Sequence, residues 1–348
     1  MQKTETGTLR ISSKNLKVYE KTKKSWKLSK KEFTNALNAV KLFKVYGNFN
    51  ALIDAKDSRF LKGFVNKNNE IKGARINILP DGRKLDKAYS LFGEDLTIHD
   101  ETSNNHWDVL YRNKGGTYSY VYTLDKIKNA VANKYNTVKE FEKYFPKLKK
   151  NVSAALKNKK DNFALPMYTL LETYMRVGNE MYYKLHGHKG LTTLKKNDVS
   201  VNKNNVTFNY LSKNGVPIVT KKEFPLVYIK RLNEILKARK KDDFVFVNEN
   251  GNPLSDINFK EAFKKYCGKE FYPHIVRSYY ATEKTKEFLQ SHKKASKEEV
   301  KDLFLGIAEK LGHKRFDKKK NEWKESYNVT IHHYIKPELV EKVKGLIQ

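Results

Sequence analysis

The chain has almost no cysteine and no long apolar segment. Among its 348 residues, Cys267 is the one cysteine, which excludes an internal disulfide and fits a reducing compartment. No apolar run approaches the ~18 residues that a membrane-spanning helix needs, and no secretory pattern of basic residues, apolar stretch and small-residue cleavage site stands at the N-terminus. We therefore expect an intracellular protein that neither spans a membrane nor is secreted.

Acidic residues are scarce relative to basic ones. The sequence has 70 Lys and Arg against 39 Asp and Glu, which gives a formal net charge of +31 at pH 7. Such a surplus attracts polyanions, so nucleic acid is the leading partner. The composition leaves two alternatives open, because AT-rich coding can inflate lysine and an anionic membrane surface can attract cations.

Motifs for metals and nucleotides are also missing. The histidine pairs His186-x-His188 and His332-His333 have no cysteine or carboxylate at ligand spacing. No glycine-rich phosphate loop of the P-loop type is found. We expect no metal, no cofactor and no use of ATP.

The length favours two domains, and a change of pattern near residue 124 divides them. Residues 1–123 contain turn signals and short β-prone runs, with one helix at 30–42; the strands are expected at 74–79, 107–111 and 117–122. In the last strand Tyr118, Tyr120 and Tyr122 share one face. We favour packing of these rings within the sheet over stacking on bases.

Residues 124–348 carry mainly helical patterns and one small sheet. Short helices are expected near 124–131 and 138–144, a lysine-rich link or phosphate-facing surface at 147–160, a long helix at 163–183, and further helices at 225–239, 255–267, 274–290, 296–311 and 336–347. An antiparallel three-stranded sheet is expected at 199–201, 206–210 and 216–219, with Lys213 at a hairpin tip. The predicted fold is α+β, with a β-rich N-terminal lobe and a mainly helical second domain.

Five residues in this second domain suit cleavage of a phosphodiester by tyrosine: Arg176, Lys213, Arg277, His313 and Tyr334. A tyrosine that stays bonded to the phosphate conserves the bond energy, so the step can be reversed. Arginine forks match the charge on non-bridging oxygens, and a lysine can protonate the leaving 5′ oxygen.

The surrounding motifs resemble those of the compact type IB DNA topoisomerases of poxviruses and bacteria. The resemblance covers about residues 160–347 and is carried by Leu170–Tyr182 (LLETYMRVGNEMY), Gly190–Lys195 (GLTTLK), Tyr210–Gly215 (YLSKNG), Arg277–Thr282 (RSYYAT), Ala308–His313 (AEKLGH) and Tyr334–Pro337 (YIKP). Before residue 160 the resemblance is limited to a β-rich lobe similar to the family's N-terminal DNA clamp.

The resemblance implies a role for each of the five residues. Arg176 and Arg277 would bind the scissile phosphate, Lys213 would protonate the 5′ oxygen, with Arg176 as a possible helper, and His313 would donate a hydrogen bond to a non-bridging oxygen. Tyr334 would attack to form a 3′-phosphotyrosyl link. The implied protein is a monomer that closes around double-stranded DNA and relaxes supercoils without ATP.

The sequence leaves three questions open. Tyr327 rivals Tyr334 as nucleophile: residues 314–330 form a charged insertion that makes the distance from His313 to Tyr334 longer than usual in the family, and Tyr327 lies nearer the usual distance. The YIKP context favours Tyr334, and Pro337 suits the first turn of the helix that follows. His274, three residues before Arg277, either binds phosphate or caps a helix. Its His-x-x-Arg spacing is similar to that of tyrosine recombinases, the alternative function, and a non-catalytic duplex-binding protein is the third.

Overall fold

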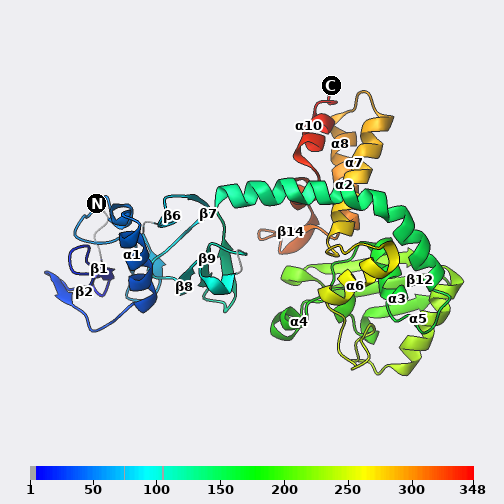
Figure 1. Cartoon of the computed structure of the whole chain (residues 1–348), viewed down its shortest axis with the longest axis horizontal. Coiled ribbons are helices and arrows are strands. Elements are labelled where there is room, and N and C mark those ends of the chain that lie inside the picture. Colours follow the sequence, from blue (N-terminus) through cyan, green and yellow to red (C-terminus); the bar gives the residue numbers. More distant parts are fainter. Residues whose placement is uncertain (1–4, 74, 104–105) are drawn as a thin grey trace. The chain divides into compact units, whose positions relative to one another are not determined.

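The computed structural model describes residues 5–73, 75–103 and 106–348, which form two compact units. The units are Met1–Asn133 and Lys134–Gln348, so the division falls within helix α2 (Leu124–Ala155). The first unit is rich in strands, whereas the second is mainly helical and contains a three-stranded antiparallel sheet (Figure 1). The predicted α+β fold is confirmed.

The first unit is built from short antiparallel strands. They are β1 (Leu9–Ile11), β2 (Val18–Lys21), β3 (Trp26–Leu28), β4 (Phe64–Val65), β5 (Ile71–Lys72), β6 (Ile76–Ile78), β7 (Lys84–Tyr89), β8 (Glu94–Ile98), β9 (Val109–Arg112) and β10 (Tyr118–Val121). They pair as β3-β2-β1-β4-β5, β10-β9-β8 and β6-β7. The helical segments are α1 (Thr34–Val45), η1 (Phe49–Leu52) and η2 (Glu101–Ser103).

The three strands and the helix expected in this unit are found, with shifted ends: the strands expected at 107–111 and 117–122 are β9 and β10. The helix expected at 30–42 is α1, and the strand expected at 74–79 is β6, with Ala74 outside the described residues. Helix α1 buries Val40 and Phe43 in the core of the unit and packs against β8.

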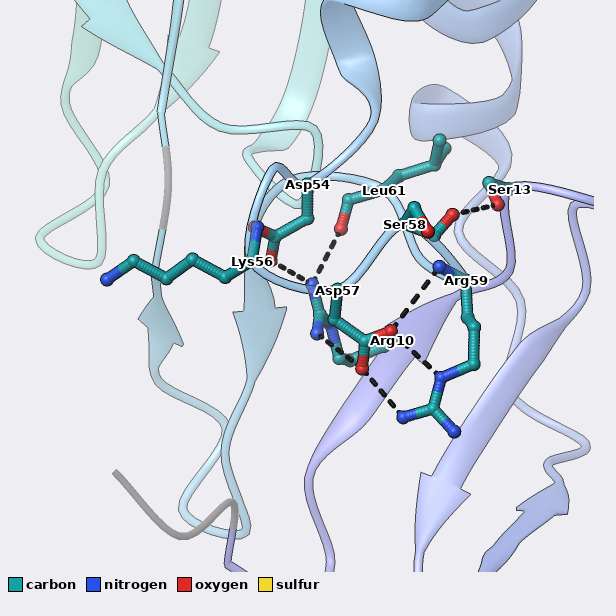
Figure 2. Close-up of polar contacts among 8 residues, drawn as sticks. All are labelled: Arg10, Ser13, Asp54, Lys56, Asp57, Ser58, Arg59 and Leu61. Carbon is teal, nitrogen blue, oxygen red and sulfur yellow. Dashed lines mark hydrogen bonds and ion pairs between the residues drawn. The ribbon is translucent and has the colours of Figure 1, made fainter. Parts of the chain in front are cut away.

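A buried arginine fastens a loop of the first unit to β1 (Figure 2). Arg10 pairs with Asp54, lies 3.8 Å from an Oδ2 of Asp57, and donates a 3.1 Å hydrogen bond to the carbonyl of Leu61. Arg59 holds Asp57 from the other side at 2.8 Å, and this hydrogen bond keeps the pKa of the carboxyl below its usual value. The buried charge is therefore paired and hydrogen-bonded, as burial requires.

The interpretation of the tyrosine face is wrong for Tyr118 and Tyr120, whereas Tyr122, one residue past β10, is half-buried. Tyr118 and Tyr120 are 47% and 39% exposed, whereas Val121 of the same strand is fully buried. Because successive strand side chains alternate, the core takes Val121 and leaves those two rings on the open face. His106 lies beside Tyr120 and Tyr122, with its ring centroid 5.8 Å and 6.1 Å from theirs.

The second unit contains most of the helices. They are α3 (Ala164–Thr173), α4 (Glu180–His186), α5 (Leu226–Ala238), α6 (Asp256–Cys267), α7 (Ile275–Ser291), α8 (Lys297–Lys310), α9 (Asn328–His333) and α10 (Pro337–Lys344), with the short η3 (Leu191–Thr193), η4 (Lys196–Asp198) and η5 (Lys213–Gly215). The strands are β11 (Val199–Asn202), β12 (Asn205–Leu211), β13 (Pro217–Glu223), β14 (Lys314–Asp317) and β15 (Glu322–Glu325).

Two apolar clusters organise this unit. The larger joins the sheet β11-β12-β13 to α3 and α5, with Phe208 fully buried at its centre. The smaller joins α7, α8 and α10, which lie side by side in Figure 1, and contains Tyr334. No helix among the described residues is long and apolar enough to cross a membrane.

Two helix predictions are wrong. Helix α2 takes up most of the region between 124 and 160, where two short helices and a lysine-rich link were expected. It continues through the lysine-rich part because Leu148 and Val152 extend its buried face there. The single helix expected at 163–183 is divided into α3 and α4, since Tyr174 adopts a left-handed conformation (φ 56°). The intervening residues form no regular element, and Asn179, the N-cap of α4, is extended.

The charged insertion after His313 forms a regular element. Strands β14 and β15 pair as a hairpin, with Phe316 opposite Trp323 and their ring centroids 5.2 Å apart. The hairpin leads into α9, so it returns the chain to the side of His313 before Tyr334 is reached.

Candidate active site

The motif that contains Arg176 and the Gly190–Lys195 motif that follows it are packed directly against each other. The backbone N–H of Leu191 donates to the carbonyl of Arg176 at 2.8 Å, and the N–H of Gly178 donates to the hydroxyl of Thr192 at 3.1 Å. These bonds replace the helical ones that the chain gives up after Tyr174. Arg176 is thus held by tertiary contacts.

Both glycines in these motifs are required by close approach. A Cβ on Gly190 would lie 2.5 Å from the carbonyl oxygen of Val177 and 2.6 Å from that of Arg176. A Cβ on Gly178 would lie 2.4 Å from the hydroxyl of Thr193. Neither glycine has a left-handed backbone, so the reason is space and not conformation.

Arg277, on the first turn of α7, is 2% exposed and connects three segments. Its guanidinium donates to the carbonyl of Tyr174, to the carbonyl of Leu311 at 2.8 Å and to Nε2 of His313 at 3.1 Å. Its Nε is buried and has no hydrogen-bond partner among the described residues. A buried donor without a partner is costly, and an anion can supply one.

His313 follows α8 through a left-handed glycine. Gly312 has φ 67°, and the N–H of His313 donates to the carbonyl of Ala308 at 2.9 Å. The imidazole is buried, with Nδ1 2.8 Å from the hydroxyl of Thr330 and Nε2 against Arg277. Side-chain contacts therefore orient both ring nitrogens.

Tyr334 lies between α9 and α10, and its ring is surrounded by basic groups. The ring centroid is 4.7 Å from that of His313 and 5.0 Å from that of His274. The Cζ atom of Arg277 lies 5.2 Å and the Nζ atom of Lys134 5.4 Å from the same centroid. The tyrosine is 2% exposed.

Lys213 lines a cavity together with the two arginines. The cavity has a volume of about 270 Å³, and its lining includes the cations Arg176, Lys189, Lys213 and Arg277, the neutral rings of His188 and His274, and one acidic residue, Asp256. Lys213 lies in η5 between β12 and β13, where Asn214 and Gly215 have left-handed backbones, and it is exposed. The cavity is therefore an electropositive pocket suited to an anion.

Burial and charge set the protonation of the site. Burial, reinforced by Arg277 and Arg176, lowers the pKa of His313 to about 2 and that of His274 to about 3. Burial raises the pKa of Tyr334, but the nearby charges, led by Arg277, together with a hydrogen bond from that residue outweigh it and lower the pKa below its ordinary value. At neutral pH the histidines are uncharged and the phenol is acidified.

The structure brings the five predicted residues into one region. Arg277 contacts His313 and Tyr334 and shares the cavity with Arg176 and Lys213. Tyr327 instead packs its ring against Phe304, 5.9 Å away. Within the described ranges, the Tyr327 side chain makes no hydrogen bond or ring contact with either arginine or with His313.

His274 belongs to this cluster of site residues. Three further residues of the cluster were not predicted from the sequence. His274 stands at the N-cap of α7, but its side chain accepts no capping hydrogen bond; its ring faces Tyr334. Thr330, Lys134 and His188 touch the cluster without any motif to mark them. Lys134 in particular is one of many lysines and is distant from Tyr334 in sequence.

Over the part of the chain that the structure describes, no group of three or more His, Cys, Asp or Glu is arranged to hold a metal ion.

Comparisons with known proteins point to one enzyme family. Residues 125–338 match the family described as eukaryotic DNA topoisomerase I, catalytic core. A curated relative, DNA topoisomerase 1B of Acanthamoeba polyphaga mimivirus, is 23% identical over 57% of this chain and 64% of its own length. The chain thus spans less than two thirds of that relative.

Solved structures of a XerH site-specific recombinase also show similarity. The pre-cleavage complex with difH substrate aligns with 51% of this chain and 50% of that chain at 18% identity and a TM-score of 0.34. The post-cleavage complex with a palindromic difH substrate aligns with 49% of this chain and 45% of that chain at the same identity and TM-score.

Proposed function

The chain belongs to the family of eukaryotic DNA topoisomerase I catalytic cores, and we propose that it acts as a type IB topoisomerase on supercoiled duplex DNA. One observation carries the proposal. Buried Arg277 contacts His313 and Tyr334, and lines the same cavity as Arg176 and Lys213. A scissile phosphate in that cavity would meet the arginines and the lysine, and the buried Tyr334, whose ring lies against Arg277, would attack it from beside the cavity.

Tyr334 is proposed to attack the phosphorus. As its Oη–P bond forms, the bond from phosphorus to the 5′ oxygen breaks, which leaves a 3′-phosphotyrosyl link. Arg277 and Arg176 neutralise charge on the non-bridging oxygens, and the unpaired Nε of Arg277 offers one of the donors. The acidified phenol favours the phenoxide that attacks.

Lys213 is proposed to protonate the departing 5′ oxygen. Its place on the η5 turn puts an exposed, long cation at the edge of the cavity. Tyr334 releases its proton to solvent water as the phenoxide forms, and Lys213 gives a proton to the 5′ oxygen as the P–O bond breaks; religation reverses both transfers. Between the two steps the free 5′ end rotates about the intact strand, so no ATP is consumed.

His313 is proposed to donate a hydrogen bond to a non-bridging oxygen. Arg277 can only donate, so without DNA Nε2 of His313 accepts and Nδ1 carries the proton. When phosphate draws Arg277 away, Nε2 is released. The Thr330 hydroxyl can either accept from or donate to Nδ1, so it supports both tautomers.

The N-terminal lobe, residues 1–123, is proposed to bind duplex DNA as a clamp, with residues 124–348 as the catalytic domain. The chain's +31 charge supports a DNA substrate, and the family match begins at residue 125. We propose that the protein acts as a monomer. Light scattering of the DNA complex tests whether the protein is a monomer. A steep fall of DNA affinity with rising salt tests whether the positive charge drives binding.

Plasmid relaxation tests the function. The full chain is incubated with supercoiled plasmid in EDTA without ATP, and covalent protein-DNA adduct is trapped with detergent. We expect the wild-type protein to relax the plasmid and to form the adduct. The Tyr334→Phe variant should lose both activities but still bind DNA. Tyr327→Phe is the matched control and should retain both; loss of adduct in this variant alone would assign the nucleophile to Tyr327.

A tyrosine recombinase is the second candidate, favoured by the position of His274 5.0 Å from the Tyr334 ring. It shares the cleavage chemistry but would act on particular paired sites with strand exchange. Relaxation of plasmids of unrelated sequence supports the topoisomerase. Binding without adduct on any DNA would leave the third candidate, a non-catalytic duplex-binding protein.

A further inference from the structure

Two successive residues of α2 grip the backbone on both sides of Tyr334. Lys134 donates its ammonium hydrogen to the carbonyl of His333, and the hydroxyl of Tyr135 donates to the carbonyl of Ile335 at 2.6 Å. Tyr135 is buried and Lys134 half-buried. These contacts join parts of the second unit that are 199 and 200 residues apart in sequence.

The same lysine also faces the aromatic ring of Tyr334. Its Nζ lies 5.4 Å from the ring centroid, nearly as close as the Cζ of Arg277 at 5.2 Å. A cation within about 6 Å of a ring face is attracted to it, and the attraction grows when the ring acquires negative charge. The ring is therefore contacted by two cations from different helices, α2 and α7.

Lys134 is not among the residues that line the cavity with Arg176, Lys213 and Arg277. Its ammonium contacts the backbone before Tyr334, the Tyr334 ring and the ring of the neighbouring Tyr135, 5.4 Å away, so a phosphate in the cavity would meet the other cations first. Half-burial of an ammonium disfavours its charge, and burial accordingly lowers the pKa of Lys134 while Tyr334 opposes this effect. A half-buried ammonium stays charged where a neighbouring group stabilises the charge, and for Lys134 that group is Tyr334.

We propose that Lys134 is a positioning residue for the nucleophile, whose ammonium holds the segment 333–335 in place and stabilises the phenoxide form of Tyr334. The inference rests on the proposed function and adds a residue to its mechanism. Lys134 transfers no proton and touches no substrate atom. It acts through Tyr334, by lowering the free energy of the charged phenoxide relative to the neutral phenol.

Other titratable and charged groups near Tyr334 also affect the pH dependence of the cleavage rate. Arg277 and His274 face it from α7, His313 from the end of α8, and Arg176 from the segment after α3; His333 precedes it on α9. The histidines have lowered pKa values and stay neutral from pH 7 upward. Lys213, the proposed proton donor, also acts in this cluster. The alkaline profile is therefore compared on the sulfur substrate described below, whose leaving thiolate needs no proton, and there a change on altering Lys134 reports on the phenol.

Three substitutions separate charge from anchoring. Lys134→Gln removes the charge but keeps a donor for the His333 carbonyl, Lys134→Met removes both, and Lys134→Arg keeps both. Tyr135→Phe removes the neighbouring anchor and leaves the charge. Lys139→Met, an exposed lysine on the same helix, is the matched control.

The measurement is the rate of adduct formation at saturating DNA, from pH 6 to 10, with the full-length protein. We expect Lys134→Gln and Lys134→Met to be slowed roughly tenfold at pH 7, with the profile displaced upward by about one pH unit, the size that one nearby charge gives. Lys134→Arg should restore rate and profile. Tyr135→Phe should lower the rate without displacing the profile.

A second substrate separates nucleophile from leaving group. With sulfur in place of the bridging 5′ oxygen, the leaving thiolate needs no proton, so a Lys213→Ala defect should be relieved. The defect of Lys134→Gln should persist, because it concerns attack. Relief of the Lys134→Gln defect by sulfur would overturn the proposal.

Two further results would also overturn it. One is a pH profile for Lys134→Gln that coincides with those of wild type and Lys139→Met; the other is a defect confined to DNA affinity and absent at saturation. If Lys134→Met does not fold, Lys134→Gln and Lys134→Arg still decide the outcome. Absence of adduct from the wild-type protein would instead refute the proposed function.

Discussion

Arg277 donates a hydrogen bond of 3.1 Å from its guanidinium to Nε2 of His313. Arginine has no acceptor, so the imidazole is neutral and carries its proton on Nδ1, which faces Thr330. The two residues proposed to bind the phosphate are therefore hydrogen-bonded to each other in its absence, while Nε of Arg277 has no partner among the described residues. This bond has to be exchanged for bonds to phosphate oxygens when DNA binds.

Arg277→Lys should remove the planar fork that serves three segments at once. We expect the cleavage rate to fall by roughly 10²–10³-fold, the range for losing a donor to a developing charge. Arg231→Lys is the matched control, because Arg231 is also buried and donates to the carbonyls of Leu156 and Asp161. It should lower the melting temperature and leave the rate of the folded protein unchanged; equal rate losses in the two variants would contradict a specific role for Arg277.

Thr330→Val should remove the hydrogen bond to Nδ1 of His313 while keeping a side chain of the same shape at position 330. The variant leaves Nδ1 of His313 without its partner, which costs about 1–3 kcal/mol of stability and frees the ring to turn. We expect slower adduct formation at saturating DNA. Thr285→Val offers the comparison, since Thr285 is equally buried and donates to the carbonyl of Ala281 within α7. The prediction is wrong if both variants cleave at the wild-type rate.

Gly190→Ala should displace Arg176. The new methyl would overlap the carbonyls of Arg176 and Val177, so we expect a loss of about 1–3 kcal/mol in the free energy of unfolding and a slower cleavage step. Gly306→Ala, in an exposed part of α8 with open space around it, should instead stabilise the protein by roughly 0.5–1 kcal/mol. Denaturant titration measures both, and a neutral Gly190→Ala would contradict the packing argument.

Stability should decline in acid because of the buried histidines. The pKa of His313 is lowered to about 2 and that of His274 to about 3, whereas an unfolded histidine has a pKa of about 6.5. The unfolded state therefore binds more protons, so this stability is fully present above pH ~6.5 and is lost as the pH falls toward the folded values. Each neutral histidine contributes a slope of about 1.4 kcal/mol per pH unit.

His313→Gln should reduce that slope between pH 6 and 4.5, as measured by urea titration at each pH. His332→Gln changes an exposed histidine nearby and should leave the slope as in the wild type. Identical slopes in the His313→Gln variant and the wild type would show that the imidazole titrates normally in the folded protein.

The sequence alone predicted the features that local pattern encodes. The alternation in residues 199–219 specifies the sheet β11-β12-β13, and Asn214-Gly215 specifies the turn that carries Lys213. The topoisomerase resemblance, confirmed by the family match, pointed to Arg176 and Arg277. Their catalytic roles, and that of Tyr334, stay predictions for the adduct assay.

Helix ends were decided by contacts that the local pattern does not contain. The apolar pattern of α3 continues beyond Tyr174, but the carbonyl of Arg176 bonds to Leu191 instead of forming a helical bond. Conversely, the lysines after Pro146 suggested a link, yet burial of Leu148 and Val152 keeps α2 intact to Ala155. In both places tertiary burial and hydrogen bonding outweigh local preference.

By itself, then, the sequence determined the fold class, the strand order of the small sheet and the set of residue types suited to phosphoryl transfer. Only the tertiary structure decided that Lys134 faces Tyr334, that Thr330 orients His313, and that Tyr118 and Tyr120 are exposed. The reason is physical: periodicity records which face of an element is buried, whereas the partner of a single lysine or threonine depends on which distant segment folds against it.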